Sequence, residues 1–296
     1  MYQHIGKYKC KIDLTLLVLV RDRQYNLNRL SNYYKDLDCV KIICDSSVKP
    51  YQGLEFINSC GFNYIYFGPI DYWDKIYKST RLVDTEYIID HPDDDIITKE
   101  SILQCVEFLD NNKDYNVCQG EIAFFTNKTI TKGNFLSYAG GIVENFYSEI
   151  PNNRLLFNFL KCPLTINHSL CRSKDFKEFY ETIYNNPPLK SLCLMDRLLL
   201  AYMSLKGNRK TLPILSQLRE RDNERVWKNN KVHAQLSDKY KDNYQLAIYK
   251  NKKLIKDTLV DNVEILKNRL TWRYYGNKDI RHVKTNINNS YLKFLL

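Results

Sequence analysis

The chain has 296 residues, of which 44% are hydrophobic and 26% charged, and this balance excludes a largely disordered, collagen-like or coiled-coil protein. Its nine cysteines are odd in number and form no Cys-x-x-Cys pair, which indicates free thiols in a reducing compartment rather than a disulfide framework or a zinc site. The sequence also lacks the glycine-rich GxGxxG and GxxxxGK[ST] loops that bind phosphates in many nucleotide-binding proteins.

Strands and helices are expected to alternate in the first half of the chain. Short apolar runs rich in β-branched residues predict buried strands at Leu14–Val20, Val40–Cys44, Tyr64–Phe67 and Tyr87–Ile89. Apolar residues at helical spacing follow each run, and Thr98 is placed to cap the fourth helix. Four β–α units in succession predict an α/β fold, with a mostly parallel sheet and helices on both of its faces.

The second half of the chain has a less regular pattern. Strands are expected at Val117–Phe125, with an interruption at Gly120, and at Leu164–Leu170. Helices are expected at Lys174–Tyr184 and Ser191–Leu205, and beyond Gly207 we expect mainly helices and connectors. We therefore predict a main domain over residues 1–210 and a basic, mainly helical extension over residues 211–296 that packs on it.

The net charge of +10 is unevenly distributed. Residues 206–256 hold 14 Lys and Arg against five Asp and Glu, whereas residues 1–100 hold 13 against 15. Such a basic segment is either a solvated helical face or a surface for an anionic partner, which would be a phosphate-bearing substrate, a phospholipid surface or nucleic acid. The longest apolar stretch near the N-terminus, Leu14–Val20, is too short to span a membrane. We expect a cytoplasmic protein, with peripheral contact to an anionic membrane surface left open.

Three consecutive aspartates, Asp93, Asp94 and Asp95, follow the fourth predicted strand. Ligands of open parallel sheets bind beyond the carboxyl ends of the strands, and neighbouring carboxylates there repel one another unless cations or donors neutralise them. Mn²⁺ and Mg²⁺ prefer such oxygen ligands, together with substrate phosphates. The triplet therefore predicts a metal-bridged diphosphate site, with a solvated acidic turn as the alternative.

An ordered set of segments resembles the family-2-type glycosyltransferases of the GT-A fold, in particular a divergent bacterial and viral branch. The resemblance covers about residues 12–225. It rests on the segments LVLVRDRQYNLNRLSNYY, IICDSS, DKIYKSTRLVDTEYI, DHPDDDIITKESI, DYNVCQG, INHSLCRS, LCLMDRLLLAYMSLKG and LPILSQLRERD. It implies a GT-A-like, Rossmann-type α/β/α sandwich that binds a nucleotide-diphosphate sugar with Mn²⁺ or Mg²⁺ as cofactor.

The resemblance also implies roles for individual residues of the donor site. Asp95 matches the metal-binding aspartate, and Asp93 matches the aspartate that faces the metal or the donor ribose, with Asp94 beside them among the donor-binding residues. Residues at three further positions would lie near the nucleotide: Arg21 after the first strand, Asp45 at the tip of the second strand, and Lys75 on a helix. For each of them an ordinary loop or surface charge is the alternative.

Two residues in the second half are further candidates. Asp196 lies in an apolar helix, where a carboxylate is unfavourable unless it is paired or functional. The resemblance implies that it deprotonates the acceptor hydroxyl, whereas an ion pair with Arg197 is the structural alternative. His168 is either a further metal ligand or a core histidine, since imidazole joins carboxylates around manganese.

These residues predict a metal-dependent glycosyltransferase, inverting at the anomeric carbon, that transfers a sugar to a glycan or lipid-linked acceptor. Two other classes stay open from the residues alone. A metal-dependent nucleotidyltransferase or phosphohydrolase could use the same acids, and a nucleic-acid-binding protein could use the basic segment. The sequence contains no recognisable nucleic-acid-binding module, so no nucleic-acid partner is expected.

Overall fold

The structure is a computed structural model that describes residues 10–125, 137–138, 147–149, 154, 166–187, 190 and 195–220. Its strands are β1 (Leu14–Val20), β2 (Val40–Asp45), β3 (Asn63–Tyr66), β4 (Tyr87–Pro92), β5 (Ile96–Ile97), β6 (Tyr115–Phe125), β7 (Ser137–Tyr138), β8 (Leu170–Arg172) and β9 (Asn208–Glu220). Its helices are η1 (Gln24–Asn26), α1 (Leu27–Tyr34), α2 (Leu54–Ser59), α3 (Tyr72–Thr80), α4 (Lys99–Asn111), α7 (Ser173–Tyr184) and α8 (Met195–Lys206). The predicted α/β class is thereby confirmed.

The strands of the described residues form one nine-stranded sheet in the order β3-β2-β1-β4-β8-β6-β9-β5, with β7 paired to β6. The first four strands are parallel, as predicted. The remainder of the sheet is mixed, because β8 is antiparallel to both β4 and β6, while β6 and β9 are parallel. The carboxyl ends of β1, β2, β3 and β4 therefore share one edge.

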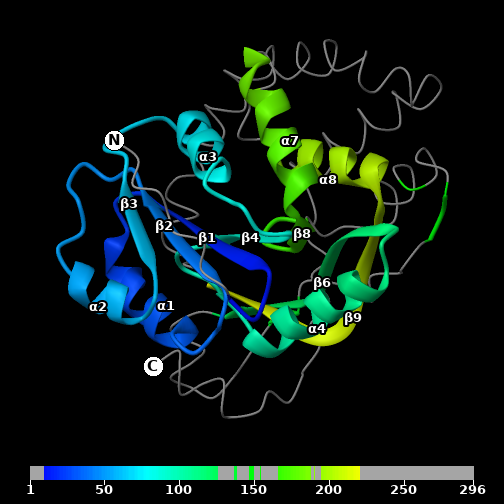
Figure 1. Ribbon diagram of the computed structural model, residues 1–296, viewed down its shortest axis with the longest axis horizontal. Coiled ribbons are helices and arrows are strands. Elements are labelled where there is room, and N and C mark those ends of the chain that lie inside the picture. The colour runs from blue at the N-terminus through cyan, green and yellow to red at the C-terminus, as the bar shows by residue number, and fades with distance from the viewer. Residues whose placement is uncertain are drawn as a thin grey trace.

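Helices cover both faces of the sheet and bury two separate apolar cores (Figure 1). Alternating residues of β1 point to opposite faces, as the period of a strand requires. Leu16 and Val18 pack with α1, α2 and α4, whereas Leu17 packs with α3, α7 and α8. The result is the three-layer α/β/α sandwich that the sequence predicted. The described part of the chain holds no helix that is long and apolar enough to cross a membrane.

Two secondary-structure predictions in the second half were wrong. Residues 166–169 form a turn, in which His168 has a φ of 63°, and the strand begins only at Leu170. Beyond Gly207, the expected helix is the 13-residue strand β9. Its leucines at positions 212, 215 and 218 recur every three residues, which suits a helix, but pairing with β6 decides the outcome.

The predicted domain boundary at residue 210 falls within β9, so residues 211–220 belong to the sheet. The rest of the predicted extension, residues 221–296, lies outside the described residues. The predicted interruption at Gly120 is a register shift between β6 and β9. A Cβ atom at Gly120 would come within 2.4 Å of the Ile214 carbonyl oxygen, which explains why a glycine occupies this position.

Tyr34 of α1 anchors the segment that carries the acid triplet. Its buried hydroxyl lies 2.6 Å from His91 Nε2 and 2.7 Å from the Ile97 carbonyl oxygen, and it accepts a hydrogen bond of 2.9 Å from the Ile97 N–H. Both ends of the segment between β4 and β5 are thus fixed to one side chain.

We predict that Tyr34→Phe lowers the free energy of unfolding by about 1–3 kcal/mol, because buried polar groups of His91 and Ile97 lose a partner. Urea denaturation measures the change. Tyr66→Phe is the matched control: its hydroxyl binds the Ser47 and Val48 carbonyls at the surface, where water replaces it, and the change should stay within about 0.5 kcal/mol. Equal effects of the two variants would contradict the anchoring role of Tyr34.

Candidate active site

Polar side chains gather where β1, β2 and β4 end. Gln24 Nε2 donates a 2.6 Å hydrogen bond to Asp45 Oδ2 at the tip of β2. The preceding residue, Arg23, contacts both Asp93 and Asp94 beyond β4. Asp45 and the acid triplet therefore lie at the same edge of the sheet.

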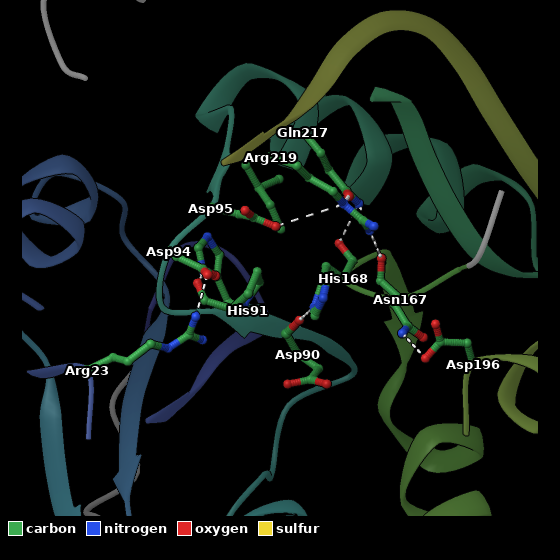
Figure 2. A network of polar contacts seen from close by, with 12 residues as sticks. Arg23, Asp90, His91, Asp94, Asp95, Asn167, His168, Asp196, Gln217 and Arg219 are labelled. Carbon is green, nitrogen blue, oxygen red and sulfur yellow. Dashed lines mark hydrogen bonds and ion pairs between the residues drawn. The ribbon is translucent and has the colours of Figure 1, made fainter. Parts of the chain in front are cut away.

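The acid triplet is divided between two arginines from distant parts of the chain. Arg23 donates one guanidinium N–H group to Asp93 Oδ1 and another to Asp94 Oδ2. Asp95 instead points toward Arg219 of β9, with Asp95 Oδ2 3.9 Å from Arg219 Nε (Figure 2). Arg29 of α1 adds a 2.9 Å hydrogen bond to the Asp94 carbonyl oxygen. Neutralisation by cations is what three adjacent carboxylates require.

Asp93 is the most buried of the three aspartates, with no exposed side-chain surface. Burial raises the pKa of Asp93 to about 6, although Arg23 opposes this shift. Its second oxygen, Oδ2, is buried and has no hydrogen-bond partner. Asp93 therefore has one oxygen in an ion pair and one oxygen available to a further cation or donor.

A chain of polar contacts joins the triplet to Asp196 at the start of α8 (Figure 2). Arg219 donates a 3.1 Å hydrogen bond to the Asn167 carbonyl oxygen, and the Asn167 side chain donates to Asp196 Oδ1. Gln217 holds the same turn, because it donates to the His168 carbonyl oxygen at 3.0 Å. Asp95 and Asp196 are about a hundred residues apart in sequence and lie in one network. The side chain of Arg197, the alternative partner of Asp196, lies outside what the structure describes.

His168 positions β4 in this structure. Its Nδ1 lies 2.5 Å from the Asp90 carbonyl oxygen, and burial together with Arg219 lowers the pKa of His168 to about 3. The ring is therefore neutral at physiological pH, and its Nδ1 is engaged by the protein backbone. This placement matches the alternative of a structural histidine, and a ligand role for His168 stays a prediction.

Lys75 is buried and Asp90 is half-buried near the edge where the parallel strands end. Lys75 is 4% exposed and donates a 3.0 Å hydrogen bond to the Val20 carbonyl oxygen at the end of β1. Burial lowers the pKa of Lys75, and Asp90 opposes that shift most strongly. Burial raises the pKa of Asp90 to about 7, which Lys75 opposes and Asp196 reinforces. Lys75 therefore lies below the predicted nucleotide site rather than open to it.

The other two predicted donor-binding residues differ in exposure. Asp45 is completely buried, and three groups donate to its oxygens: Gln24 Nε2, the Tyr64 hydroxyl and the Ser47 backbone N–H. It orders the loop after β2. Arg21 is open to solvent, with 55% of its side chain exposed and weak contacts to Asp22 and the Ile70 carbonyl.

The predicted metal ligands Asp93, Asp95 and His168 do not lie together in the structure. Among the described residues, no three His, Cys, Asp or Glu side chains form a group that could hold a metal ion. Asp93 and Asp94, however, share one cationic group, and Asp93 keeps a buried oxygen without a partner. Hard cations often use one or two carboxylates plus substrate phosphates, so this pair fits Mn²⁺ or Mg²⁺. Asp95 and His168 lie apart from the pair, against Arg219 and the Asp90 carbonyl.

Several residues of this network were missed by sequence reasoning. Arg23 lies two positions beyond Arg21 in the same charged turn, Asn167 precedes His168, and Arg219 belongs to the segment LPILSQLRERD. Each stood in a segment already marked by the resemblance. Their contacts join residues far apart in the chain, so no local signal distinguished them from their neighbours.

Comparison with known proteins finds similar solved structures but no matching family. No family model and no curated protein matches the chain. Among solved structures, it is similar to S. aureus TarS, with 16% identity and a TM-score of 0.47 over 73% of this chain and 38% of that one. It is also similar to residues 1–349 of S. aureus TarS (16% identity, TM-score 0.49, 70% and 60% covered) and to a mycobacterial protein (12%, 0.43, 73% and 70%). The chain thus spans less than two thirds of either TarS structure, and at these scores the likeness carries no argument about activity.

The pKa of Asp90 predicts a pH dependence of stability. Because the folded pKa of about 7 exceeds the usual value near 3.9, the folded state retains a proton that the unfolded state loses between pH 4 and 7. This contribution to stability is present at low pH and is lost as the pH rises through 7. Asp90→Asn has no such proton. Relative to this variant, the free energy of unfolding of the wild type should fall by on the order of 1–2 kcal/mol between pH 4 and 7, a value that allows for partial solvent access. Urea denaturation at pH 4.5 and 8 measures it, and a constant difference would contradict the assignment.

Proposed function

We propose that the protein is a glycosyltransferase that moves a sugar from a nucleotide-diphosphate sugar to an acceptor hydroxyl. The observation that carries this proposal is the network joining the acid triplet to Asp196 through Arg219 and Asn167. This network connects a cluster of carboxylates that needs cations, and would bind the diphosphate through one, to a separate carboxylate that would accept a proton.

The donor would lie at the edge formed by β1, β2 and β4. Asp93 and Asp94 would hold Mn²⁺ or Mg²⁺, and the cation supplies neutralisation of the charge that develops on the leaving diphosphate. Arg21, which follows β1 and is exposed, would contact the nucleotide. Asp45 would act indirectly, by fixing the loop after β2 through Gln24 and Ser47.

Asp196 would serve as the base that takes the proton of the acceptor hydroxyl. Asn167 donates to one of its oxygens, which fixes the carboxylate and leaves the other oxygen for the acceptor. Direct displacement by a single base on the face opposite the diphosphate inverts the anomeric carbon. Arg219 would position this base relative to the donor, because it contacts both Asp95 and the Asn167 carbonyl.

The acceptor would be a glycan or a lipid-linked molecule. Peripheral attachment to an anionic membrane would rest on the basic residues 206–256, most of which lie outside the described residues. Vesicle binding that weakens as the salt concentration rises would support this part of the proposal.

The proposal is tested by the thermal stability of the protein with nucleoside diphosphates and their sugars, with and without Mn²⁺. Binding to the folded state raises the melting temperature. We expect stabilisation by one nucleoside diphosphate in the presence of Mn²⁺, followed by detection of a transferred sugar. Stabilisation by oligonucleotides alone, or transfer of a nucleotidyl group, would contradict it.

We predict that Asp196→Asn lowers turnover by roughly 10²- to 10⁴-fold, because the amide cannot accept the proton. The affinity for the nucleoside diphosphate should stay within about twofold of the wild type, since Asp196 contacts the donor site only through Asn167 and Arg219. Product assay and nucleotide titration measure the two effects. Full turnover, or a product that retains the donor's anomeric configuration, would exclude Asp196 as the base.

We also predict that Asp93→Asn abolishes Mn²⁺-dependent binding of the nucleotide, because it removes a charged oxygen ligand and leaves the shape unchanged. Asp95→Asn is the matched variant: it keeps the Asp93–Asp94 pair and should weaken binding less. Calorimetric titration of the nucleoside diphosphate with and without Mn²⁺ compares the two. Unchanged binding by Asp93→Asn would refute the metal assignment.

A further inference from the structure

Arg23 contacts the two carboxylates that are proposed to hold a divalent cation. It lies between β1 and η1, and its guanidinium contacts Asp93 Oδ1 and Asp94 Oδ2 at once. These aspartates lie some 70 residues further along the chain, so the pairing is a product of the fold. With 40% of its side chain exposed, Arg23 has solvent beside it into which it can move.

A cation on Asp93 Oδ1 and Asp94 Oδ2 would compete with Arg23, which contacts the same two oxygens. Asp93 and Asp94 need compensation, because Asp93 is fully buried and keeps a second oxygen without a hydrogen-bond partner. Arg219 is committed elsewhere, to Asp95, Gln217 and the Asn167 carbonyl. A cation that binds these two oxygens would therefore displace Arg23, whereas Arg219 would stay in place.

We propose that Arg23 neutralises Asp93 and Asp94 in the free protein, where it competes with the metal, and that it binds the diphosphate of the donor once the metal has displaced it. The planar fork of a guanidinium suits phosphate oxygens as well as it suits carboxylates. Since a nucleotide-diphosphate brings new negative charge to this edge, the released Arg23 finds an anionic partner within reach. Binding of metal and donor would thus be coupled through one side chain. This inference rests on the proposed function.

The proposal requires opposite changes in two affinities when Arg23 is removed. Arg23→Ala should bind Mn²⁺ alone roughly three- to tenfold more tightly, the scale of a partly exposed ion pair that no longer competes. With saturating Mn²⁺, its affinity for a nucleoside diphosphate should fall by about tenfold or more, because a charge-assisted contact to phosphate is lost. A merely structural role for Arg23 would weaken both.

The experiment uses the full chain. Electron paramagnetic resonance of free Mn²⁺ first measures the Mn²⁺ affinity without nucleotide. The affinities for adenosine, guanosine, cytidine and uridine diphosphates are then measured at saturating Mn²⁺. Arg81→Ala is the control, because Arg81 is exposed and pairs only weakly with Glu181, so both affinities should stay within about twofold of the wild type. Arg23→Gln, which keeps a polar side chain without the charge, gives the same readout if the alanine variant fails to fold.

Tighter Mn²⁺ binding with weaker nucleotide binding supports the proposal. Unchanged or weaker Mn²⁺ binding by both Arg23 variants overturns it while leaving the proposed function intact, provided that the wild type binds Mn²⁺ and a nucleoside diphosphate. A wild type that binds no nucleoside diphosphate overturns the proposed function, and this inference with it.

Discussion

The mutual repulsion of Asp93, Asp94 and Asp95 is the constraint on which the rest of the site depends. Three carboxylates in sequence at the end of a strand cannot stay ionised together without nearby positive charge. The fold meets this requirement with Arg23, which precedes the triplet by some 70 residues, and Arg219, which follows it by more than 120. Arg23 follows β1 of the parallel half and Arg219 belongs to β9 of the mixed half, so the triplet contacts residues from both halves of the fold.

The two halves of the sheet would contribute different parts of the proposed chemistry. The parallel strands β1, β2 and β4 end at one edge and present the acids and Arg21 there. The mixed half brings the turn at Asn167 and His168, which is held on one side by the Asp90 carbonyl and on the other by Gln217. This turn presents Asn167 to Asp196. Asp196, the proposed base, is thus held by the Asn167 side chain, and the turn that carries Asn167 is fixed by contacts between side chains and backbone carbonyl groups.

Much of the first half could be predicted from the sequence, since strand and helix periods are local. The run Leu14–Val20 and the cap at Thr98 were identified correctly, because each depends on a few neighbouring residues. The strand β9 was not, because its leucines suit two periods and only its pairing with β6 decides between them.

The site shows the same division between local and long-range information. The sequence located the acids at the strand ends, but it could not show which cations neutralise them. It placed Lys75 near the nucleotide, whereas the fold buries its ammonium group against the Val20 carbonyl. The roles assigned to Asp93, Asp95, His168 and Asp196 through the family resemblance stay predictions.

The central claim is that the donor diphosphate lies at the edge formed by β1, β2 and β4, beside Asp196. A crystal structure with a nucleoside diphosphate and Mn²⁺ tests it most directly. Our account predicts a cation on oxygens of Asp93 and Asp94, the diphosphate beyond the ends of β1 and β4, and Asp196 on the side from which an acceptor would approach. A nucleotide bound away from this edge, or with its diphosphate between Asp196 and the anomeric position, would contradict the account.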